Sequence, residues 1–499
     1  MPAEIKSNAG EYVLAECTGT LSADSSKIKI RGLVGLNYNI LVRDKQIILK
    51  INGTRDAAKG VVWTGATSGV WDYQTENFSL SDQPTTFVAN DEVIFGSEPV
   101  QKTINMNDLM PTSGVLFNHD NGSYIINGTD GGFSGTGSLV KNGSGQLYLN
   151  SVKSNYTGPT ILNGGTTYLK SLADAGTASS IGASTSDASN LQLNKCTVVI
   201  STDNTATNHG VTLTDTVNVN ITTGSTSLKG IVCGKGTLVK SGSGQLNLGY
   251  ATNTYQGGTI LKGGTLAQGS WNTTFGTLGG NLTMQGGTIN IMANNNTGTV
   301  PNLQYAYKIV DGTTNYINAA YRCKIQGSFT GGGTLNISIP YVRTDIAANW
   351  STFTGVLNVT GNQLRFNTET DMSGGTLNLG DAVYMGHFSS GSATVLSLTS
   401  KIGALSSSFA TSTVSNGSYN VGYNNKEVTF AGKLNCTSVS KYGTAIWNLT
   451  STESTSPINI YGGTVRARNS GGYITTGNIV IYSGGTLDGT GYVKNVTVQ

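Results

Sequence analysis

Short stretches in which apolar and polar residues alternate run through the whole chain. Residues 147 to 149 read Leu-Tyr-Leu, and residues 288 to 291 read Thr-Ile-Asn-Ile. An alternation of period two places successive side chains on opposite faces of a strand, so that one face is apolar and the other polar. Patterns of period 3.6, which would indicate helices, are scarce. The sequence therefore predicts an all-β chain of short strands.

Glycine-rich turns separate many of these strands. Gly-Gly-Thr recurs near residues 164, 258, 264, 287, 333, 375, 463 and 485. Neighbouring copies at 264 and 287, and at 463 and 485, follow each other at nearly the same interval. Glycine suits sharp corners, because positive φ angles and close backbone approach disfavour a Cβ atom. This spacing is typical of one coil of a parallel β-helix, in which each coil is buried by its neighbours.

The sequence also contains a longer repeat, which includes the Gly-Gly-Thr turns. Residues 137–169 align without a gap to residues 236–268, and 18 of the 33 positions are identical. In each copy two strands flank a Gly-Ser-Gly corner, and Tyr-x-Gly then leads into a third strand and a Gly-Gly-Thr turn. We interpret each copy as one three-sided coil of about 30 residues. An altered third copy lies at 441–465, where Lys441 and Trp447 keep the outline.

Together these repeats predict a right-handed parallel β-helix, a solenoid of Gly-Gly-Thr-punctuated coils. The expected regions are 1–55 as an N-terminal cap or the tail of a preceding repeat unit, 56–130 as Trp/Phe-rich first coils, 131–300 as the β-helix with the long repeats, 301–370 as aromatic-rich coils with longer loops, and 371–499 as truncated C-terminal coils. An uncapped last strand would leave an open edge. We therefore expect this segment to be part of a longer polypeptide.

The composition narrows the class of protein. The chain has 68 glycines in 499 residues, a formal net charge of +3 and 37% hydrophobic residues, so it differs from highly charged, hydrophobic-poor disordered chains. It shows no clustered Lys/Arg face of the kind that binds nucleic acid. It also lacks a run of about 20 apolar residues that could span a membrane, and an export signal at its start. We expect neither a nucleic-acid partner nor a membrane-spanning segment.

The residues that most often bind metals are dispersed. Five cysteines lie far apart without Cys-x-x-Cys, and their odd number argues against a disulfide framework, so we predict that they are buried small residues. His119, His209 and His387 stand in separate segments, and we interpret each as a surface or turn residue. No metal and no cofactor are expected.

The long repeat resembles a known family. Leu-x-Lys-x-Gly-x-Gly-x-Leu-x-Leu, followed by Tyr-x-Gly-x-Thr and a Gly-Gly-Thr strand, resembles the passenger-associated β-strand repeat of autotransporter-type proteins. Residues 339–361 are more similar to repeat proteins of the Bacteroidota. The resemblance implies an extracellular β-helical segment of a bacterial surface or secreted protein. Its expected role is adhesion or glycan contact, with glycans or host or bacterial surface components as partners.

Catalysis is the alternative, because β-helices also carry polysaccharide lyases and glycoside hydrolases. Such enzymes need an acid and a base held together on one face. The local candidates are Asp120 with Asp130, Asp311 with Arg322, and Arg343 with Asp345. None recurs at coil spacing with another acid, so no catalytic residue is predicted and a non-enzymatic role is favoured.

A binding role is easier to place. Tyrosine, arginine and tryptophan are densest between residues 301 and 370, and aromatic rings with flanking hydrogen-bonding groups are suited to stacking on sugar rings. The candidate binding residues are Tyr305, Tyr307, Tyr321, Arg322, Tyr341, Arg343 and Trp350. Packing in the core is the competing role for these side chains.

Overall fold

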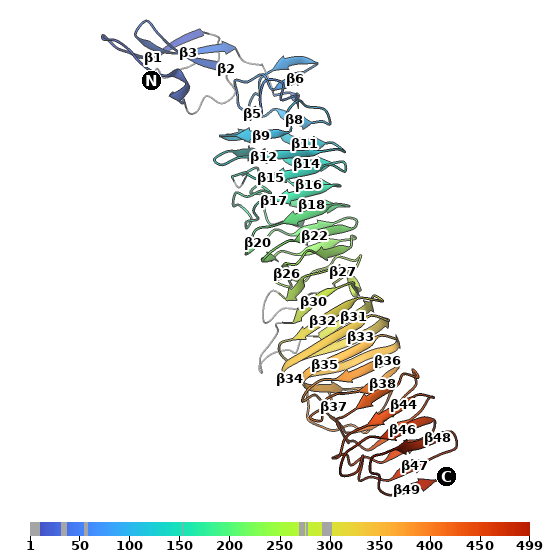
Figure 1. Cartoon of the computed structure of the whole chain (residues 1–499). Helices are drawn as coiled ribbons and strands as arrows, with labels where there is room; N and C mark the ends of the chain where they lie inside the picture. The colour runs from blue at the N-terminus through green and yellow to red at the C-terminus, as the bar shows by residue number, and fades with distance from the viewer. Residues whose placement is uncertain are drawn as a thin grey trace. The chain divides into compact units, whose positions relative to one another are not determined.

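The computed structural model describes residues 10–30, 37–53, 58–151, 153–268, 275, 278–291 and 302–499. These residues form strands and three single-turn 3-10 helices, η1 (Ser25–Lys27), η2 (Ala188–Asn190) and η3 (Leu278–Gly280). The chain divides into two compact units, residues 1–220 and 221–499. Each unit contains a parallel β-solenoid (Figure 1). The all-β solenoid prediction is confirmed.

The strands of the first unit are β1 Gly10–Glu16, β2 Asn37–Arg43, β3 Gln46–Gly53, β4 Gly60–Trp63, β5 Val70–Trp71, β6 Phe78–Leu80, β7 Gln83–Thr85, β8 Glu92–Phe95, β9 Thr103–Met106, β10 Leu109–Pro111, β11 Gly114–Asn118, β12 Ser123–Asn127, β13 Gly132–Ser134, β14 Ser138–Asn142, β15 Gln146–Leu149, β16 Thr160–Asn163, β17 Thr166–Leu169, β18 Leu191–Asn194, β19 Thr197–Ile200, β20 Thr205–Thr207, β21 Val211–Leu213 and β22 Val217–Ile221.

The strands of the second unit are β23 Ser225–Leu228, β24 Val232–Gly234, β25 Leu238–Ser241, β26 Gln245–Leu248, β27 Thr259–Leu261, β28 Thr265–Gln268, β29 Asn281–Met284, β30 Gly287–Ile291, β31 Asn302–Ile309, β32 Thr314–Ala319, β33 Cys323–Gly331, β34 Thr334–Phe353, β35 Val356–Phe366, β36 Asp371–Leu379, β37 Tyr384–His387, β38 Thr399–Ser406, β39 Thr413–Ser415, β40 Ser418–Val421, β41 Val428–Phe430, β42 Lys433–Asn435, β43 Ser438–Lys441, β44 Ile446–Leu449, β45 Ile458–Ile460, β46 Gly463–Ala467, β47 Ile479–Ile481, β48 Gly485–Gly489 and β49 Val496–Val498.

The first three strands form an antiparallel sheet in the order β1-β3-β2. Asp44 and Lys45 join β2 to β3 with φ angles of 49° and 64°, which suits the two-residue turns of hairpins. Residues 25–27 form η1, and its N-cap residue Asp24 accepts a hydrogen bond from the Ser26 N–H. β3 pairs with both β1 and β2 in this sheet.

The pairing of strands shows where one coil ends and the next begins. Leu139 of β14 pairs with Thr160 of β16, and Gln146 of β15 pairs with Thr166 of β17. The long repeat therefore supplies strands to two successive coils, which lie next to each other in Figure 1. Our interpretation of the repeat as one three-sided coil is wrong, because its third and fourth strands stack on its first and second instead of closing the same turn.

Glycines at the corners do what the sequence predicts. Gly143 has a φ angle of 81°, and a Cβ there would lie 2.3 Å from the His119 carbonyl oxygen. Gly165 has a φ angle of 63°, and a Cβ there would lie 2.3 Å from the Gly145 oxygen. Both the positive φ angle and the close approach of the preceding coil exclude a side chain at these two positions.

The three histidines are buried, so their assignment to the surface is wrong. His119 is 1% exposed, and His209 and His387 are 0% exposed. Each has a polar partner nearby: His119 Nδ1 lies 3.3 Å from the Asn121 carbonyl oxygen, His209 Nδ1 lies 2.7 Å from Thr207 Oγ1, and His387 Nε2 lies 2.9 Å from Ser400 Oγ. A polar side chain at an inward position is tolerated when it is hydrogen-bonded.

The cysteines match their prediction in part. None of the five, all of which the structure describes, forms a disulfide, and Cys196, Cys323 and Cys436 are buried. Cys17 and Cys233 are half-buried.

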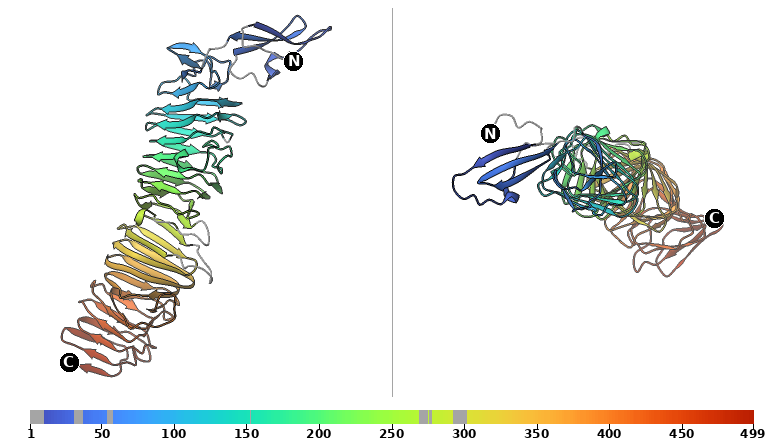
Figure 2. Two further views of the ribbon diagram at one scale, coloured as in Figure 1. Left: turned by 180° about the vertical axis from the view of Figure 1, so that it is seen from behind. Right: turned by 90° about the horizontal axis from the view of Figure 1, so that it is seen from above.

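In the second unit, the long strands β33, β34 and β35 follow one another between residues 323 and 366. β34 has 20 residues and continues around a corner of the coil. Its first part pairs with β32, and its second part pairs with β33. The register against β35 shifts between Ile339 and Arg343, so residues 340–342 bulge outward at the corner. The left view of Figure 2 shows these long strands from behind.

Candidate binding surface

Three of the seven candidate binding residues fill the core. Tyr305, Tyr307 and Trp350 are buried. Tyr307 and Trp350 stack on Phe329 with ring centroids 4.2 Å and 3.9 Å away. Burial raises the pKa of the Tyr307 hydroxyl, which donates a hydrogen bond to the Leu303 carbonyl oxygen (3.0 Å). These rings have no face left for a ligand, and the candidate surface excludes them.

The other four candidates meet at the corner where β34 bulges. The rings of Tyr321 and Tyr341 lie 5.5 Å apart at an angle of 58°, and Tyr341 is 38% exposed. Cys323 pairs with Thr344, so the preceding residues, Arg322 and Arg343, occupy neighbouring positions on adjacent coils. The structure thus brings together two aromatic rings and two guanidinium groups at this corner.

A carboxylate and two further cations extend this group along the same face. Lys324 pairs with Asp345, and Asp345 pairs with Arg365 on the next coil. Asp345 Oδ2 lies 3.9 Å from Arg343 Nε. We call Arg322, Lys324, Arg343, Asp345 and Arg365 the arginine cluster.

Arg365 is held firmly within the arginine cluster. Its Nε and Nη2 donate to Gln363 Oε1 at 2.9 Å and 2.6 Å, and its Nη1 donates to the Ser392 carbonyl oxygen at 2.6 Å. Its guanidinium lies 4.5 Å from the centre of the Phe388 ring. Burial lowers the pKa of Arg365; nearby Arg343 lowers it further, and Asp345 acts in the opposite direction.

A short loop covers one end of the arginine cluster. Phe388 and Val395 form an antiparallel bridge, and between them the Gly391 N–H donates to Asp345 Oδ2 (3.3 Å). Asp345 is only 3% exposed as a result. Buried Nε atoms of Arg322 and Arg343, and Oδ1 of Asp345, have no hydrogen-bond partner. The arginine cluster therefore holds more desolvated positive charge than its one carboxylate can neutralise.

The sequence analysis missed Arg365 as part of this surface. A signal exists, since Lys324, Asp345 and Arg365 follow one another at the interval of one coil. Coil length varies, however, and the interval between Gly60 of β4 and its partner Glu92 of β8 is much longer. Spacing alone therefore does not fix which residues are neighbours.

Outward asparagines form ladders instead of free binding groups. Asn358 Nδ2 donates to Asn336 Oδ1 (2.9 Å), and Asn378 Nδ2 donates to Asn358 Oδ1 (3.2 Å). In the first unit Asn163 Nδ2 donates to Asn142 Oδ1 (3.1 Å). Each amide is engaged by the next coil, which stabilises the stack.

Four tyrosines form a similar ladder in the second unit. The rings of Tyr423, Tyr442, Tyr461 and Tyr482 are nearly parallel, with successive centroids 5.0, 5.1 and 4.3 Å apart. Each inner ring has both faces covered by its neighbours. Such a ladder leaves mainly ring edges for a ligand, unlike the tilted pair Tyr321 and Tyr341.

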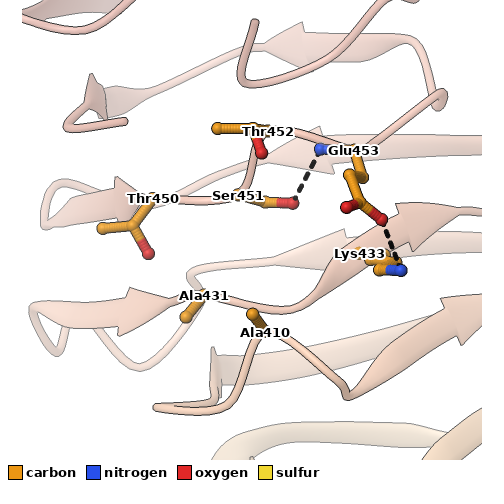
Figure 3. A pocket seen from close by; sticks show the side chains of 7 residues that line it. All are labelled: Ala410, Ala431, Lys433, Thr450, Ser451, Thr452 and Glu453. Carbon is orange, nitrogen blue, oxygen red and sulfur yellow. Dashed lines mark hydrogen bonds and ion pairs between the residues drawn. The ribbon is translucent and has the colours of Figure 1, made fainter. Parts of the chain in front are cut away.

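A polar hollow near the end of the second unit lacks these features. Its lining residues are Ala410, Ala431, Lys433, Thr450, Ser451, Thr452 and Glu453 (Figure 3). Lys433 and Glu453 form an ion pair, and the Glu453 N–H donates to Ser451 Oγ (3.4 Å). No lining side chain is aromatic, so the hollow offers no ring for a sugar to stack on.

Two of the acidic residues considered for catalysis accept hydrogen bonds from backbone N–H groups at corners of the coils. Asp120 Oδ1 accepts a hydrogen bond from the Ser144 N–H (3.0 Å), and Asp311 Oδ1 accepts one from the Gly332 N–H (2.6 Å). Arg343 and Asp345 do lie together, as described above. Within the described residues, no three or more His, Cys, Asp or Glu side chains gather as metal ligands. Nor does any helix of that part of the chain have the length and apolar character to cross a membrane.

The motif lysine of the long repeat points inward. Lys141 and Lys240 are fully buried, and Lys240 Nζ donates to the carbonyl oxygens of Ser241, Gly242 and Gly263 at 2.7, 3.1 and 3.2 Å. Lys441 of the altered third copy donates in the same way to Gly462 (3.3 Å). Lys240 and Lys441 therefore each join two successive glycine corners.

The motif tyrosine and threonine form a second buried network. Tyr156 shares a hydrogen bond with Thr160 (2.6 Å between oxygens), and Thr160 Oγ1 donates to the Ile181 carbonyl oxygen (3.1 Å). Tyr255 and Thr259 repeat this geometry at the same two distances, with Leu278 as the acceptor. The polar signature of the repeat is thus a set of contacts between coils.

Comparison with known proteins agrees with this description. The family model described as passenger-associated-transport-repeat matches residues 139–167 and 238–267. The chain carries two passenger-associated transport repeats. The adhesin BmaC autotransporter of Brucella suis biovar 1 (strain 1330) is 34% identical to the chain over 184 residues. The match covers 30% of this chain and 5% of that adhesin's length. No solved structure matches significantly.

The resemblance to autotransporter passenger repeats is therefore confirmed. The matched repeats and the similarity to an autotransporter adhesin fit a β-helical surface protein.

Proposed function

We propose that this chain is a non-catalytic, extracellular segment of a bacterial surface or secreted protein that adheres by contacting glycans. The observation that carries the proposal is the corner at residues 340–342, where the Tyr321 and Tyr341 rings lie beside Arg322 and Arg343. The similarity to an autotransporter adhesin supports adhesion as the role. The likeness of residues 339–361 to repeat proteins of the Bacteroidota stays a prediction.

The chemistry of this corner suits a sugar. A tilted pair of tyrosines offers ring surface to the apolar face of a pyranose, and neighbouring donors fix its hydroxyl groups. A single such contact is weak. Repeated saccharide units presented by a cell surface would add avidity without any further contact in the protein.

Binding to polysaccharide-coated beads tests the proposal. We expect Tyr341→Ala to weaken retention about fivefold to tenfold, the effect of losing one aromatic contact of about 1–1.4 kcal/mol. Tyr473→Ala is the matched control, since Tyr473 is 40% exposed and lies away from the corner in sequence and pairing. Equal loss in both variants would contradict a site at the corner.

The same mixtures distinguish the enzymatic alternative. A polysaccharide lyase leaves new unsaturated ends, and a glycoside hydrolase leaves new reducing ends. Turnover of either kind by the purified chain would replace the adhesive role with catalysis.

A further inference from the structure

We propose that the arginine cluster binds the carboxylate or sulfate groups of an anionic polysaccharide. This inference rests on the proposed glycan contact and names the class of glycan. It follows from the charge, the desolvation and the fixed geometry of the side chains of the arginine cluster, which lie on β33, β34 and β35 and, for Arg322, directly before β33.

The charges on this face do not balance. Arg322, Lys324, Arg343 and Arg365 supply four positive charges, and Asp345 supplies one negative charge. Register places the pairs Lys324–Asp345 and Asp345–Arg365 on adjacent coils. Arg365 is only 6% exposed, so an anion arriving at this face would meet the half-buried Arg322, Lys324 and Arg343.

The Asp345 carboxylate does not fully neutralise the neighbouring cations, because one of its oxygens already accepts another hydrogen bond. Its Oδ2 already accepts from the Gly391 N–H, and it lies 3.9 Å from Arg343 Nε, beyond hydrogen-bond distance. Arg322 Nε and Arg343 Nε are buried without a partner. In a partly desolvated site an unpaired charge interacts strongly with an opposite one, because water screens it less.

One cation of the arginine cluster, Arg365, is held in place by the protein, whereas Arg322 and Arg343 are available to a ligand. Arg365 is immobilised by Gln363, Ser392 and the Phe388 ring, so it contributes charge and keeps the face rigid. Arg322 and Arg343 adjoin the exposed corner and are placed to contact the ligand. A guanidinium fork matches the planar carboxylate and binds sulfate oxygens equally well in pairs.

The surroundings favour a charged sugar over an isolated anion. Tyr321 and Tyr341 offer ring surface within the same corner, so one saccharide unit can stack while its acidic group reaches the arginines. The asparagine ladder on the adjoining part of the coil is uncharged and does not compete. A polysaccharide with an acidic group on each unit fits both features.

Polygalacturonate, heparin and dextran are the probes, with affinity measured on the full chain in about 0.1 M salt, where exposed charges are moderately screened. We expect binding to polygalacturonate, to heparin or to both. Tighter binding of polygalacturonate, which carries carboxylates alone, would identify the carboxylate as the recognised group. Arg322→Gln and Arg343→Gln should each weaken it about tenfold, the effect of losing one charge-assisted hydrogen bond. Arg466→Gln is the control of equal charge change, since Arg466 is already paired with Asp488 (2.8 Å).

A substitution of opposite sign guards against loss of folding. Asp345→Asn keeps the shape and an acceptor for the Gly391 N–H but removes the competing negative charge. We expect it to tighten binding about threefold or more, a change that damage to the fold does not produce.

The outcomes separate this inference from the proposed function. If dextran binds as tightly as polygalacturonate and Arg343→Gln has no effect, the inference is overturned while glycan contact stands. If none of the three polysaccharides binds, both are overturned. Equal weakening by Arg466→Gln, or equally tight binding of double-stranded DNA, would indicate unspecific charge attraction and also overturn it.

Discussion

At the scale of single residues, the repeat is defined by polar side chains that point inward. Lys141 follows Leu139 by two positions, so strict alternation places both on the inward face. The polar character of lysine conceals this signal in the sequence. Three carbonyl oxygens around Lys240 show why a cation is tolerated there, since each buried acceptor finds a donor.

Replacing this lysine tests the assignment. We expect Lys240→Met to lower the free energy of unfolding by about 2 kcal/mol, because corner carbonyl groups lose their buried donor. Hydrogen exchange at the amides of residues 238–248 should rise with it. Lys262→Met is the control, since Lys262 is exposed. Unchanged exchange in Lys240→Met would show that the ammonium adds nothing to the corner.

The cysteines give a second prediction at this scale. Burial raises the pKa of the Cys196 and Cys436 thiols to about 11 and that of Cys323 to about 12. The thiolate is the reactive form, so these three should react slowly with a disulfide reagent in the folded chain. We expect Cys17 and Cys233 to react first. Five thiols reacting at one rate under native conditions would contradict this burial.

Alternation along a strand also explains which of the candidate binding residues the sequence could assign to the core and which it could not. Leu303, Tyr305, Tyr307 and Ile309 share one parity, and the structure buries all four. Their composition drew attention to binding, whereas their alternation indicated the core. Tyr321, Arg322 and Arg343 lie at a corner, where alternation lapses and gives no information.

At the scale of strands and coils, local signals predicted much of the fold. Gly-Gly-Thr marked corners such as the one at Gly165, where positive φ and a close backbone approach require a residue without Cβ. Other corners have no glycine, such as the one at Lys195 (φ 45°) between β18 and β19. The long repeat was divided incorrectly, since its boundaries in sequence do not coincide with one turn of the backbone. Asp345 and Arg365 are neighbours on adjacent coils. This contact could not be predicted, because it depends on the length of each coil, which the sequence does not define.

One corner glycine can be tested directly. Gly165→Ala should lower the free energy of unfolding by more than about 1 kcal/mol, because alanine is strained at positive φ and its Cβ would press on the Gly145 oxygen. Gly96→Ala is the control, since no atom lies within 4 Å of a Cβ built there. The measurement is the denaturant midpoint followed by tryptophan fluorescence. Equal midpoints for the two variants would contradict the packing at this corner.

At the scale of the whole molecule, stability depends on pH through the buried bases. Burial lowers the pKa of His119, His209 and His387 below the ordinary value of 6.5. Below pH 6.5 the unfolded chain therefore binds more protons than the folded chain. We expect the free energy of unfolding to fall as the pH drops through 6.5.

The buried lysines extend this dependence to alkaline pH. Burial lowers the pKa of Lys141, Lys240 and Lys441 from 10.5 to about 8. Between pH 8 and 10.5 the unfolded chain again holds the extra protons, so the free energy of unfolding should rise with pH. Denaturation at a series of pH values measures both windows. His209→Gln should flatten the acid window alone, and an unchanged slope would contradict its burial.

The inward lysines also bear on how long such a chain lasts outside a cell. Proteases that cut after lysine or arginine need an accessible, extended segment. The chain has only 30 lysines and arginines in 499 residues, and Lys141, Lys240 and Lys441 lie inside the coils. Proteases therefore cannot cut after these three buried lysines as long as the coils remain stacked.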